Sequence, residues 1–272
     1  MKLAQFHQKG HIRVGMIEGK YLLPLNFSGD MISLIEKGGD MDTKGEPIRL
    51  SDIQLESPVS RPSKIIALGL NYKDHAQESK GEVPEVPLIF AKFPNTITGP
   101  KGDIAWDTKI TAKVDFEAEL AVIIGKTVKE CSEEEAMDGV FGYTCANDVS
   151  ARDLQFGDGQ WVRGKSLDSF CPLGPWIVTA DEIDDAHNLK IECKLNGKKM
   201  QESNTGLMIF KIPKIMAFLS QHFTLLPGDI ILTGTPHGVG AFRDPPVYMK
   251  DGDEVVVEIE CIGRLENICR SK

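Results

Sequence analysis

Short apolar runs divide this chain into candidate strands. The runs at 64–70, 87–93, 116–124 and 142–146 are compact and are separated by polar segments rich in turn residues, a pattern typical of buried strands. Near the end of the chain, apolar and polar residues alternate over 255–261. We therefore expect the chain to close on a long antiparallel strand.

The N-terminal residues carry a pattern of their own. Residues 11–25 predict two short strands joined by a turn, and residues 31–37 predict a short helix. Two prolines in the segment 57–63 then interrupt the chain, because proline fixes φ and removes a backbone donor. We divide the sequence here into a small N-terminal module, residues 1–58, and a main domain, residues 59–272.

Turn and helix signals favour a mainly β main domain. Asn196-Gly197 lies between two strand-like runs and predicts a two-residue hairpin. Ser132 and Glu135 form a capping box that opens a short helix, and the apolar stripe within 212–219 has helical spacing, which we interpret as core. Many short strands with few helices predict an α+β, mainly β fold built as a rolled or sandwiched mixed sheet.

Two glutamates interrupt the apolar run at 116–124. Glu117 and Glu119 are two residues apart, so on one strand both carboxylates face the same way, roughly 7 Å apart at about 3.4 Å per residue. The alternative is the solvated face of an edge strand, but Ala121 and Ile123 on that face are apolar. Because buried like charges are costly, a divalent cation is the simplest reason for this pair.

A third acidic residue completes a predicted metal site. Asp148 follows the apolar run at 142–146, at the point where that strand would reach the two glutamates. All-oxygen ligation of this kind suits Mg²⁺ or Mn²⁺, which retain open positions for water and substrate. We therefore predict that Glu117, Glu119 and Asp148 bind Mg²⁺ or Mn²⁺.

A polar segment after the run at 64–70 offers a candidate base. On a helix, His75 and Glu78 would share a face, and a carboxylate beside an imidazole raises its basicity and fixes its tautomer. A solvated surface pair is the alternative. The length and polarity of 72–86 are also compatible with a mobile lid over a site.

Residues 159–166 match the phosphate-binding pattern G-x-x-x-x-G-K-[ST]. That pattern functions between an apolar strand and a helix, whereas here polar residues precede it and prolines follow it. We therefore reject nucleotide binding as the main interpretation and keep it as a distant alternative. Lys165 is instead expected to present a cation to an anionic substrate. Thr235 lies in a glycine-rich turn that could bind a ligand, and a plain surface turn is the alternative.

Composition narrows the possible partners. The chain has 272 residues and a net charge of −9, and an acidic chain without a basic cluster is a poor binder of nucleic acid or of anionic membranes. It has no apolar run long enough for a membrane span, and its first ten residues lack the apolar core of a signal peptide. With six cysteines that form no Cys-x-x-Cys pair, we expect reduced thiols in a cytoplasmic protein.

Taken together, the polar motifs resemble the fumarylacetoacetate hydrolase family. The resemblance extends over about residues 60 to 270 and preserves the order of the motifs, each of which is weak alone. They are GLNYKDH at 69–75, DFEAE at 115–119, NDVSARDLQ at 147–155, GKSLD at 164–168, PLGP at 172–175 and Gly-Thr-Pro at 234–236.

The resemblance implies a β-roll, a homodimer and a set of functional residues. It places Mg²⁺ or Mn²⁺ on Glu117, Glu119 and Asp148, and it makes His75 and Glu78 the catalytic pair. It further matches Lys165 to an active-site lysine and Thr235 to a threonine near the substrate carboxylate, with Arg152 and Gln155 as further substrate-binding residues.

The reaction implied is enolate chemistry on a small anionic 2-oxo acid. We expect cleavage of a C–C bond, by hydrolysis of an acylpyruvate or fumarylpyruvate or by decarboxylation of oxaloacetate, with a metal-stabilised enolate. The alternatives on the same site are isomerisation or decarboxylation of 2-hydroxyhepta-2,4-diene-1,7-dioate and lyase action on ureidoglycolate, because fold and site do not fix the substrate.

Overall fold

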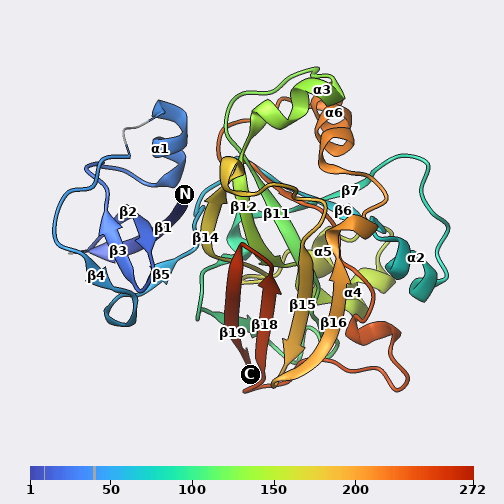
Figure 1. Ribbon diagram of the computed structural model, residues 1–272. Helices are drawn as coiled ribbons and strands as arrows, with labels where there is room; N and C mark the ends of the chain where they lie inside the picture. The colour runs from blue at the N-terminus through green and yellow to red at the C-terminus, as the bar shows by residue number, and fades with distance from the viewer. Residues whose placement is uncertain (9, 39–40) are drawn as a thin grey trace.

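A long mixed sheet runs through the whole chain in the computed structural model, which describes residues 1–8, 10–38 and 41–272 (Figure 1). Within these residues the sheet has twelve strands, and all neighbours on its main path are antiparallel except β17 and β6. In spatial order they are β4 (Ile48–Arg49), β3 (Tyr21–Pro24), β2 (His11–Glu18), β1 (Lys2–Gln8), β14 (Cys171–Thr179), β12 (Val140–Asn147), β11 (Ala118–Ile124), β17 (Ile230–Leu232), β6 (Ile65–Gly69) and β7 (Leu88–Lys92), with β5 (Leu55–Glu56) beside β1 and β8 (Ile97–Thr98) beside β14.

A second sheet packs against the first. It has five strands among the described residues, and its apolar side chains share one core cluster with β11 and β12, for example Val257 with Leu120 and Val122. This arrangement confirms the predicted mainly β fold with a mixed, sandwiched sheet. The strands are β16 (Lys198–Asn204), β15 (Lys190–Leu195), β18 (Glu254–Ile259), β19 (Gly263–Ser271) and β9 (Asp103–Trp106), and β10 (Val114–Asp115) pairs separately with β13 (Ser150–Ala151).

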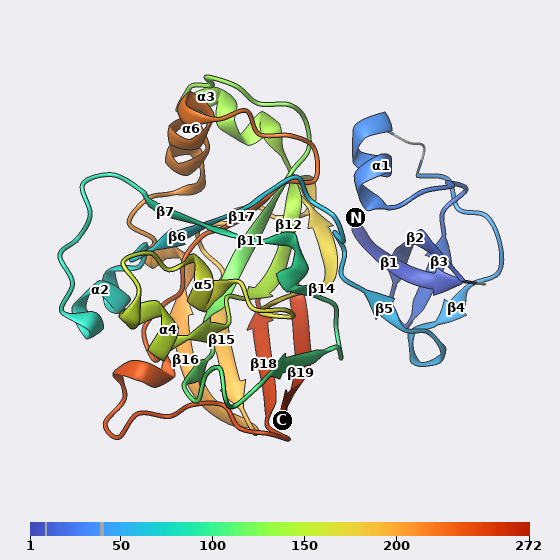
Figure 2. The ribbon, with the colours of Figure 1, turned by 180° about the vertical axis from the view of Figure 1, so that it is seen from behind.

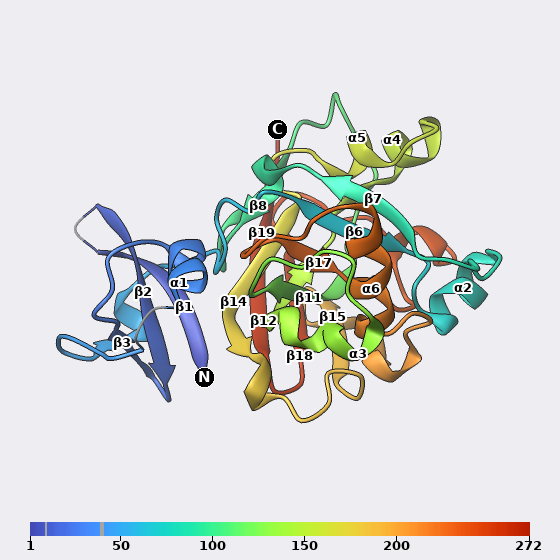
Figure 3. The same ribbon diagram turned by 90° about the horizontal axis from the view of Figure 1, so that it is seen from above.

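The N-terminal strands form one wing of the long sheet (Figures 1 and 3). Strand β1 joins this wing to the rest by pairing with β14, where Leu3 lies opposite Ile177. A buried cluster crosses the same junction, because Leu3 and Met31 belong to it together with Leu173 and Ile177. The division at residue 58 stays a prediction, and the two parts share a core.

Helices cover the ends of the sheets. α6, with Pro213 in its first turn, buries the predicted apolar stripe in the main core, and α3 lies beside it (Figures 1 and 3). No helix among the described residues is long and apolar enough to cross a membrane. The helices are α1 (Met31–Lys37), α2 (Lys73–Ser79), α3 (Glu133–Ala136), α4 (Arg152–Gly157), α5 (Val162–Lys165) and α6 (Ile212–His222), with 3₁₀ turns η1 (Leu50–Asp52), η2 (Pro94–Thr96), η3 (Met137–Gly139), η4 (Ala180–Glu182), η5 (Thr205–Leu207) and η6 (Gly240–Phe242).

The end of the chain differs from the prediction of a single long strand over 255–261. Strand β18 ends at Ile259, and Cys261 lies in an exposed turn with φ of 64°. A residue in the left-handed region cannot continue an extended strand. The chain therefore closes on a hairpin whose second strand is β19. Apolar and polar residues alternate on both sides of this turn, so the hydrophobic pattern alone did not locate the turn.

Candidate active site

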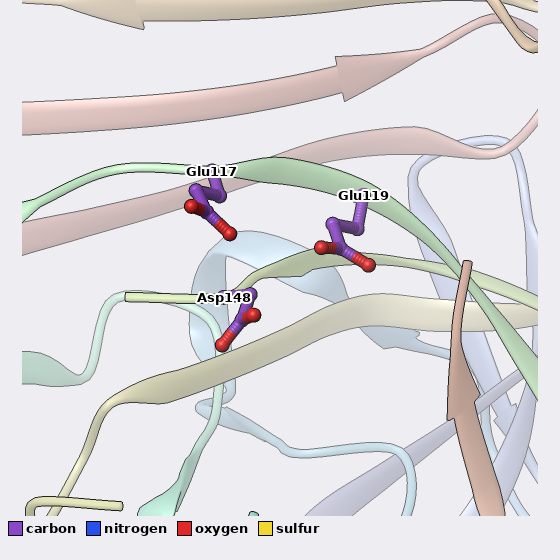
Figure 4. A group of neighbouring side chains, drawn as sticks. All are labelled: Glu117, Glu119 and Asp148. Carbon is purple, nitrogen blue, oxygen red and sulfur yellow. The ribbon is translucent and has the colours of Figure 1, made fainter. Parts of the chain in front are cut away.

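Three buried carboxylates meet where β11 and β12 run side by side. Glu119 lies on β11, Glu117 immediately precedes it, and Asp148 directly follows β12. The register Ala118↔Asn147 brings these positions together. One oxygen from each carboxylate lies within 4.8 Å of those of the other two, and Figure 4 shows the three side chains turned toward one another.

The sequence predicted that both glutamates lie within one strand, but only Glu119 does. Strand β11 begins at Ala118, because the Glu117 amide donates to the side-chain oxygen of Asn147 at 2.9 Å. The Asp148 amide in turn donates to the Glu117 carbonyl at 2.9 Å. These bonds replace a regular ladder and still hold both carboxylates on the side of Asp148.

Glu119 is the least compensated member of the group. Its Oε2 accepts a hydrogen bond from the Gly234 amide at 2.7 Å, while Oε1, although buried, has no partner among the described residues. Burial, followed by repulsion from Asp148 and Glu117, raises the pKa of Glu119 well above its ordinary value. A buried carboxylate oxygen without a donor is the chemistry expected of a cation ligand.

Two basic side chains neutralise Glu117. The Lys165 ammonium lies 2.6 Å from Glu117 Oε2 and 2.7 Å from Asp148 Oδ2, and the Arg152 guanidinium lies 2.7 Å from Glu117 Oε1. Although burial opposes ionisation, these two cations hold the pKa of Glu117 at about 2. Burial likewise opposes the charge of Lys165, but Asp148 and Glu117 raise its pKa above the ordinary value.

Two charged residues of this cluster were missed by the sequence analysis. Lys92 on β7 places its fully buried ammonium 2.6 Å from Asp148 Oδ1, and Asp115 accepts from Arg152 Nε at 2.8 Å. Lys92 is the sole charge in the apolar run at 87–93, which was the available signal. Asp115 lies within a quoted motif, but nothing in its spacing pointed to Arg152.

The charges of the cluster fit a divalent cation. Four carboxylates face three cations, which leaves one excess negative charge when all are ionised, and none when Glu119 is protonated. A bound divalent ion would ionise Glu119 and leave one net positive charge. The cluster would then attract an anionic ligand. The carboxylates involved are Asp115, Glu117, Glu119 and Asp148, and the cations are Lys92, Arg152 and Lys165.

The predicted histidine–glutamate pair forms on helix α2. Figure 2 shows this helix at the outer edge of the main body. His75 Nδ1 lies 3.2 Å from Glu78 Oε2. Glu78 Oε1 accepts from the Gly238 amide at 2.9 Å, so the glycine-rich loop after β17 orients the carboxylate. With a proton on Nδ1, the other ring nitrogen of His75 is a base.

A pocket of about 250 Å³ joins these groups. Of the three carboxylates, Glu117 alone lines it among the described residues. Its lining contains six of the nine predicted site residues, namely His75, Glu117, Arg152, Gln155, Lys165 and Thr235. The pocket therefore combines one carboxylate of the buried cluster, two cations and a potential general base.

The apolar remainder of the pocket was not predicted. Its side chains come from β6 and the residue after it, β7, the α4–α5 segment and η6, and they are Leu68, Leu70, Phe90, Phe156, Trp161 and Phe242. The mixed lining suits a small molecule with an anionic end and a less polar remainder.

Two further predicted residues are held by other protein groups. The Thr235 hydroxyl donates to the Ala118 carbonyl at 3.0 Å and accepts from Gln201 at 2.8 Å. Gln155 accepts from Arg152 at 2.8 Å. Both line the pocket, and their roles toward a ligand stay predictions.

The segment 159–166 lacks the surroundings of a phosphate-binding loop. Helix α4 precedes it where a strand would be required, and α5, which lies within the segment, spans only Val162–Lys165. A backbone cradle at the start of a long helix is therefore not formed here.

Known proteins with similar sequences and structures carry related names. An oxaloacetate tautomerase of Rattus norvegicus, described as mitochondrial, is 51% identical over 218 residues, which is 80% of this chain and 69% of the relative. A fumarylacetoacetate hydrolase from Exiguobacterium antarcticum superimposes with a TM-score of 0.91 at 39% identity and full coverage of both chains. A maleylpyruvate hydrolase from Sphingobium sp. SYK-6, solved with manganese(II) and pyruvate, has a TM-score of 0.82 at 32% identity and covers 100% of this chain and 99% of its own.

The family profile described as fumarylacetoacetate (FAA) hydrolase C-terminal matches residues 64–270. This range contains the carboxylate cluster, the His75–Glu78 pair and the whole pocket. The chain therefore belongs to the fumarylacetoacetate hydrolase family.

Proposed function

We propose that this protein is a Mg²⁺- or Mn²⁺-dependent tautomerase that interconverts the enol and keto forms of oxaloacetate. The observation that carries the proposal is that Glu117 of the carboxylate cluster and His75 of the His75–Glu78 pair line the same small pocket. The names of relatives that match four fifths of the chain support oxaloacetate as the substrate.

The reaction needs only a positioned base and a stabilised oxyanion. As the enol becomes the keto acid, the 2-hydroxyl loses a proton, C3 gains one, and the double bond moves from C2=C3 to C2=O. His75 can hold the transferred proton on the ring nitrogen that faces away from Glu78, and the Glu78 carboxylate, 3.2 Å from Nδ1, stabilises the imidazolium that forms. When bound, a divalent cation supplies positive charge that stabilises the enolate oxygen.

The chain offers the cations that a dicarboxylic 2-oxo acid requires. Arg152 and Lys165 line the pocket, and both are buried. Because Lys165 is paired with Glu117 and Asp148, it competes for these carboxylates with any ion bound by the cluster. Metal binding would weaken those pairs and make the Lys165 ammonium available to a substrate carboxylate.

The test follows the ultraviolet absorbance of enol-oxaloacetate against its spontaneous decay, with Mg²⁺, with Mn²⁺ and with a chelator. We expect chelator-sensitive acceleration by the wild-type protein. His75→Ala should lower the rate by about a hundredfold or more, the usual contribution of a general base. Its metal-induced rise in melting temperature should equal that of the wild type, because His75 is not a predicted metal ligand.

His222→Ala is the matched control, since His222 is exposed on α6 outside the pocket. It should retain the wild-type rate. A fully active His75→Ala variant would overturn the role given to His75, and loss of its metal response would reassign the residue to the metal centre.

C–C cleavage, the reaction expected from the sequence, is the second candidate. The similarity to a maleylpyruvate hydrolase solved with manganese(II) and pyruvate favours it. The same His75–Glu78 pair could activate water to attack the distal carbonyl of a 2,4-dioxo acid. Pyruvate release from oxaloacetate and from acetylpyruvate, assayed beside enol decay, separates the reactions: tautomerisation consumes enol without releasing pyruvate.

A further inference from the structure

Two aromatic residues form a shared wall between the site pocket and a neighbouring cavity. Phe90 and Trp161 line the site pocket, and both also line a neighbouring cavity of about 370 Å³. Their ring centroids are 5.3 Å apart at an interplanar angle of 72°, an edge-to-face contact. The two residues therefore lie at the boundary between the site pocket and a second cavity.

Trp161 is fixed in this wall by a glycine. A Cβ atom added to Gly69 would lie 2.4 Å from Trp161 Cζ3 and 2.8 Å from Cη2, so the indole ring rests directly on the backbone at the end of β6. The ring can occupy this place because Gly69 has no side chain. Trp161 is half-buried, and its carbonyl accepts the Lys165 amide at 3.0 Å.

The two aromatic residues differ in their distance from the charged groups. The Lys165 ammonium lies 5.1 Å from the centre of the Phe90 ring, so Phe90 also interacts with a charged group of the site. No ion pair or side-chain hydrogen bond ties the Trp161 indole to the carboxylate cluster in the described part of the chain. Of the two, Trp161 is thus the residue whose side chain acts on the pocket's shape alone.

We infer that Trp161 is a specificity-determining residue that limits the size of the distal group on a 2-oxo acid substrate. A carboxylate and a 2-oxo oxygen belong beside Arg152 and Lys165, and the remainder of the molecule extends toward Leu68 and Trp161. With the indole in place, the pocket of about 250 Å³ suits a small substrate. Without it, the pocket opens into the neighbouring cavity. The choice of 2-oxo acids rests on the proposed function.

The test compares two 2-oxo acids that undergo the same enol–keto conversion. Oxaloacetate is small, whereas phenylpyruvate carries an apolar ring on C3. In Trp161→Ala, the ratio of kcat/KM for phenylpyruvate to kcat/KM for oxaloacetate should rise about tenfold or more over the wild-type ratio, as expected when a steric limit in an apolar pocket is removed. Using the ratio cancels any effect that the substitution transmits through Lys165 to both substrates.

Two control variants test whether the change in the ratio comes from the Trp161 side chain. Trp161→Phe keeps an aromatic ring at the boundary and should shift the ratio much less. Val162→Ala enlarges the space outside the site pocket, because Val162 lines the neighbouring cavity and not the site pocket, and it should leave the ratio unchanged. If Trp161→Ala does not fold, Trp161→Leu, which is smaller than tryptophan but still apolar, should shift the ratio in the same direction.

An unchanged ratio in a folded Trp161→Ala or Trp161→Leu variant would overturn the inference, as would an equal shift in Val162→Ala. If the wild type converts neither acid, the proposed function fails, and calorimetric binding of phenylpyruvate to the metal-loaded protein then decides. Binding about tenfold tighter to Trp161→Ala than to wild type supports the wall, and equal binding contradicts it.

Discussion

Lys92 carries a positive charge into the interior of the long sheet. Its ammonium donates to Asp148 at 2.6 Å, to the Val149 carbonyl at 3.3 Å and to the Lys165 carbonyl, so it ties β7 to two segments of the site. The side chain is fully buried. Removing one partner of such a pair is costly, because the remaining charge stays buried without compensation.

We therefore expect Lys92→Met to destabilise the metal-free protein by about 3 to 5 kcal/mol, measured by urea unfolding. Mg²⁺ should restore part of this loss, since it supplies positive charge to Asp148. Lys199→Met is the control: Lys199 pairs with Glu192 and Glu202 on the surface, and its loss should matter far less. Equal stability of Lys92→Met and the wild type would show that Asp148 does not depend on Lys92.

At this scale, the sequence identified the residues whose chemistry is unusual for their surroundings. Glu117, Glu119 and Asp148 were predictable because acidic residues in apolar runs need a partner. Lys92 satisfies the same criterion, but a lone lysine near a strand end also suits an exposed end. Lys92 and Asp148 are 56 residues apart in the sequence, and local residue spacing does not predict a contact over that separation.

At the scale of elements, the first amide of helix α6 is capped by the side chain of His187. The Ile212 amide, at the first residue of α6, donates to His187 Nε2 at 3.1 Å, which requires the ring to be neutral at that nitrogen. Burial, followed by the charge of Lys211, lowers the pKa of His187, while Asp185 partly opposes this. The helix start is therefore coupled to the protonation of one side chain.

The sign of the pH dependence follows from this lowered pKa. The unfolded chain binds a proton at His187 near an ordinary pKa of about 6.5, and the folded chain binds it only at lower pH. The stabilisation is present above that ordinary pKa and is lost as pH falls through it toward the folded value. Between about pH 8 and about pH 5.5, the wild type should lose more free energy of unfolding than His187→Gln, which cannot titrate. Parallel losses would contradict the coupling.

Elements with local signals were predictable, and those set by distant contacts were not. The hairpin at Asn196-Gly197, the capping box of Ser132 and Glu135, and the start of α6 formed as predicted, because turn and cap chemistry acts within a few residues. The start of β11 was misplaced. It depends on the side chain of Asn147, a residue of the neighbouring strand β12, which accepts a hydrogen bond from the Glu117 amide.

At the scale of the whole molecule, the sequence predicted two separate parts, residues 1–58 and 59–272, which the structure joins through one sheet and one core cluster. A proline-rich segment at 57–63 is a reasonable boundary signal. The pairing of β1 with β14 and the shared cluster of Leu3, Met31 and Leu173 link residues that are far apart in sequence. Pairing at this separation depends on the completed sheet, so the apolar pattern of either strand alone does not predict it.

The carboxylate cluster gives metal binding a global effect on stability. Its ligands come from two chain segments that meet through the pairing of β11 with β12. An ion that binds only the folded state stabilises it by about 2.7 kcal/mol at a hundredfold excess over its Kd. Mg²⁺ or Mn²⁺ should therefore raise the melting temperature, and a chelator should reverse the rise.

Glu119→Gln separates metal binding from folding. Glutamine keeps an acceptor for the Gly234 amide, which now donates to Glu119 Oε2 at 2.7 Å, and it removes a carboxyl that Asp148 and Glu117 repel. The metal-free variant should melt at or above the wild-type temperature, while the metal-induced rise should be largely lost. Glu134→Gln, at an exposed acidic residue on α3, should keep the full rise. A full metal response in Glu119→Gln would remove Glu119 from the ligand set, and lower stability without metal would mean that its carboxylate is needed for folding itself.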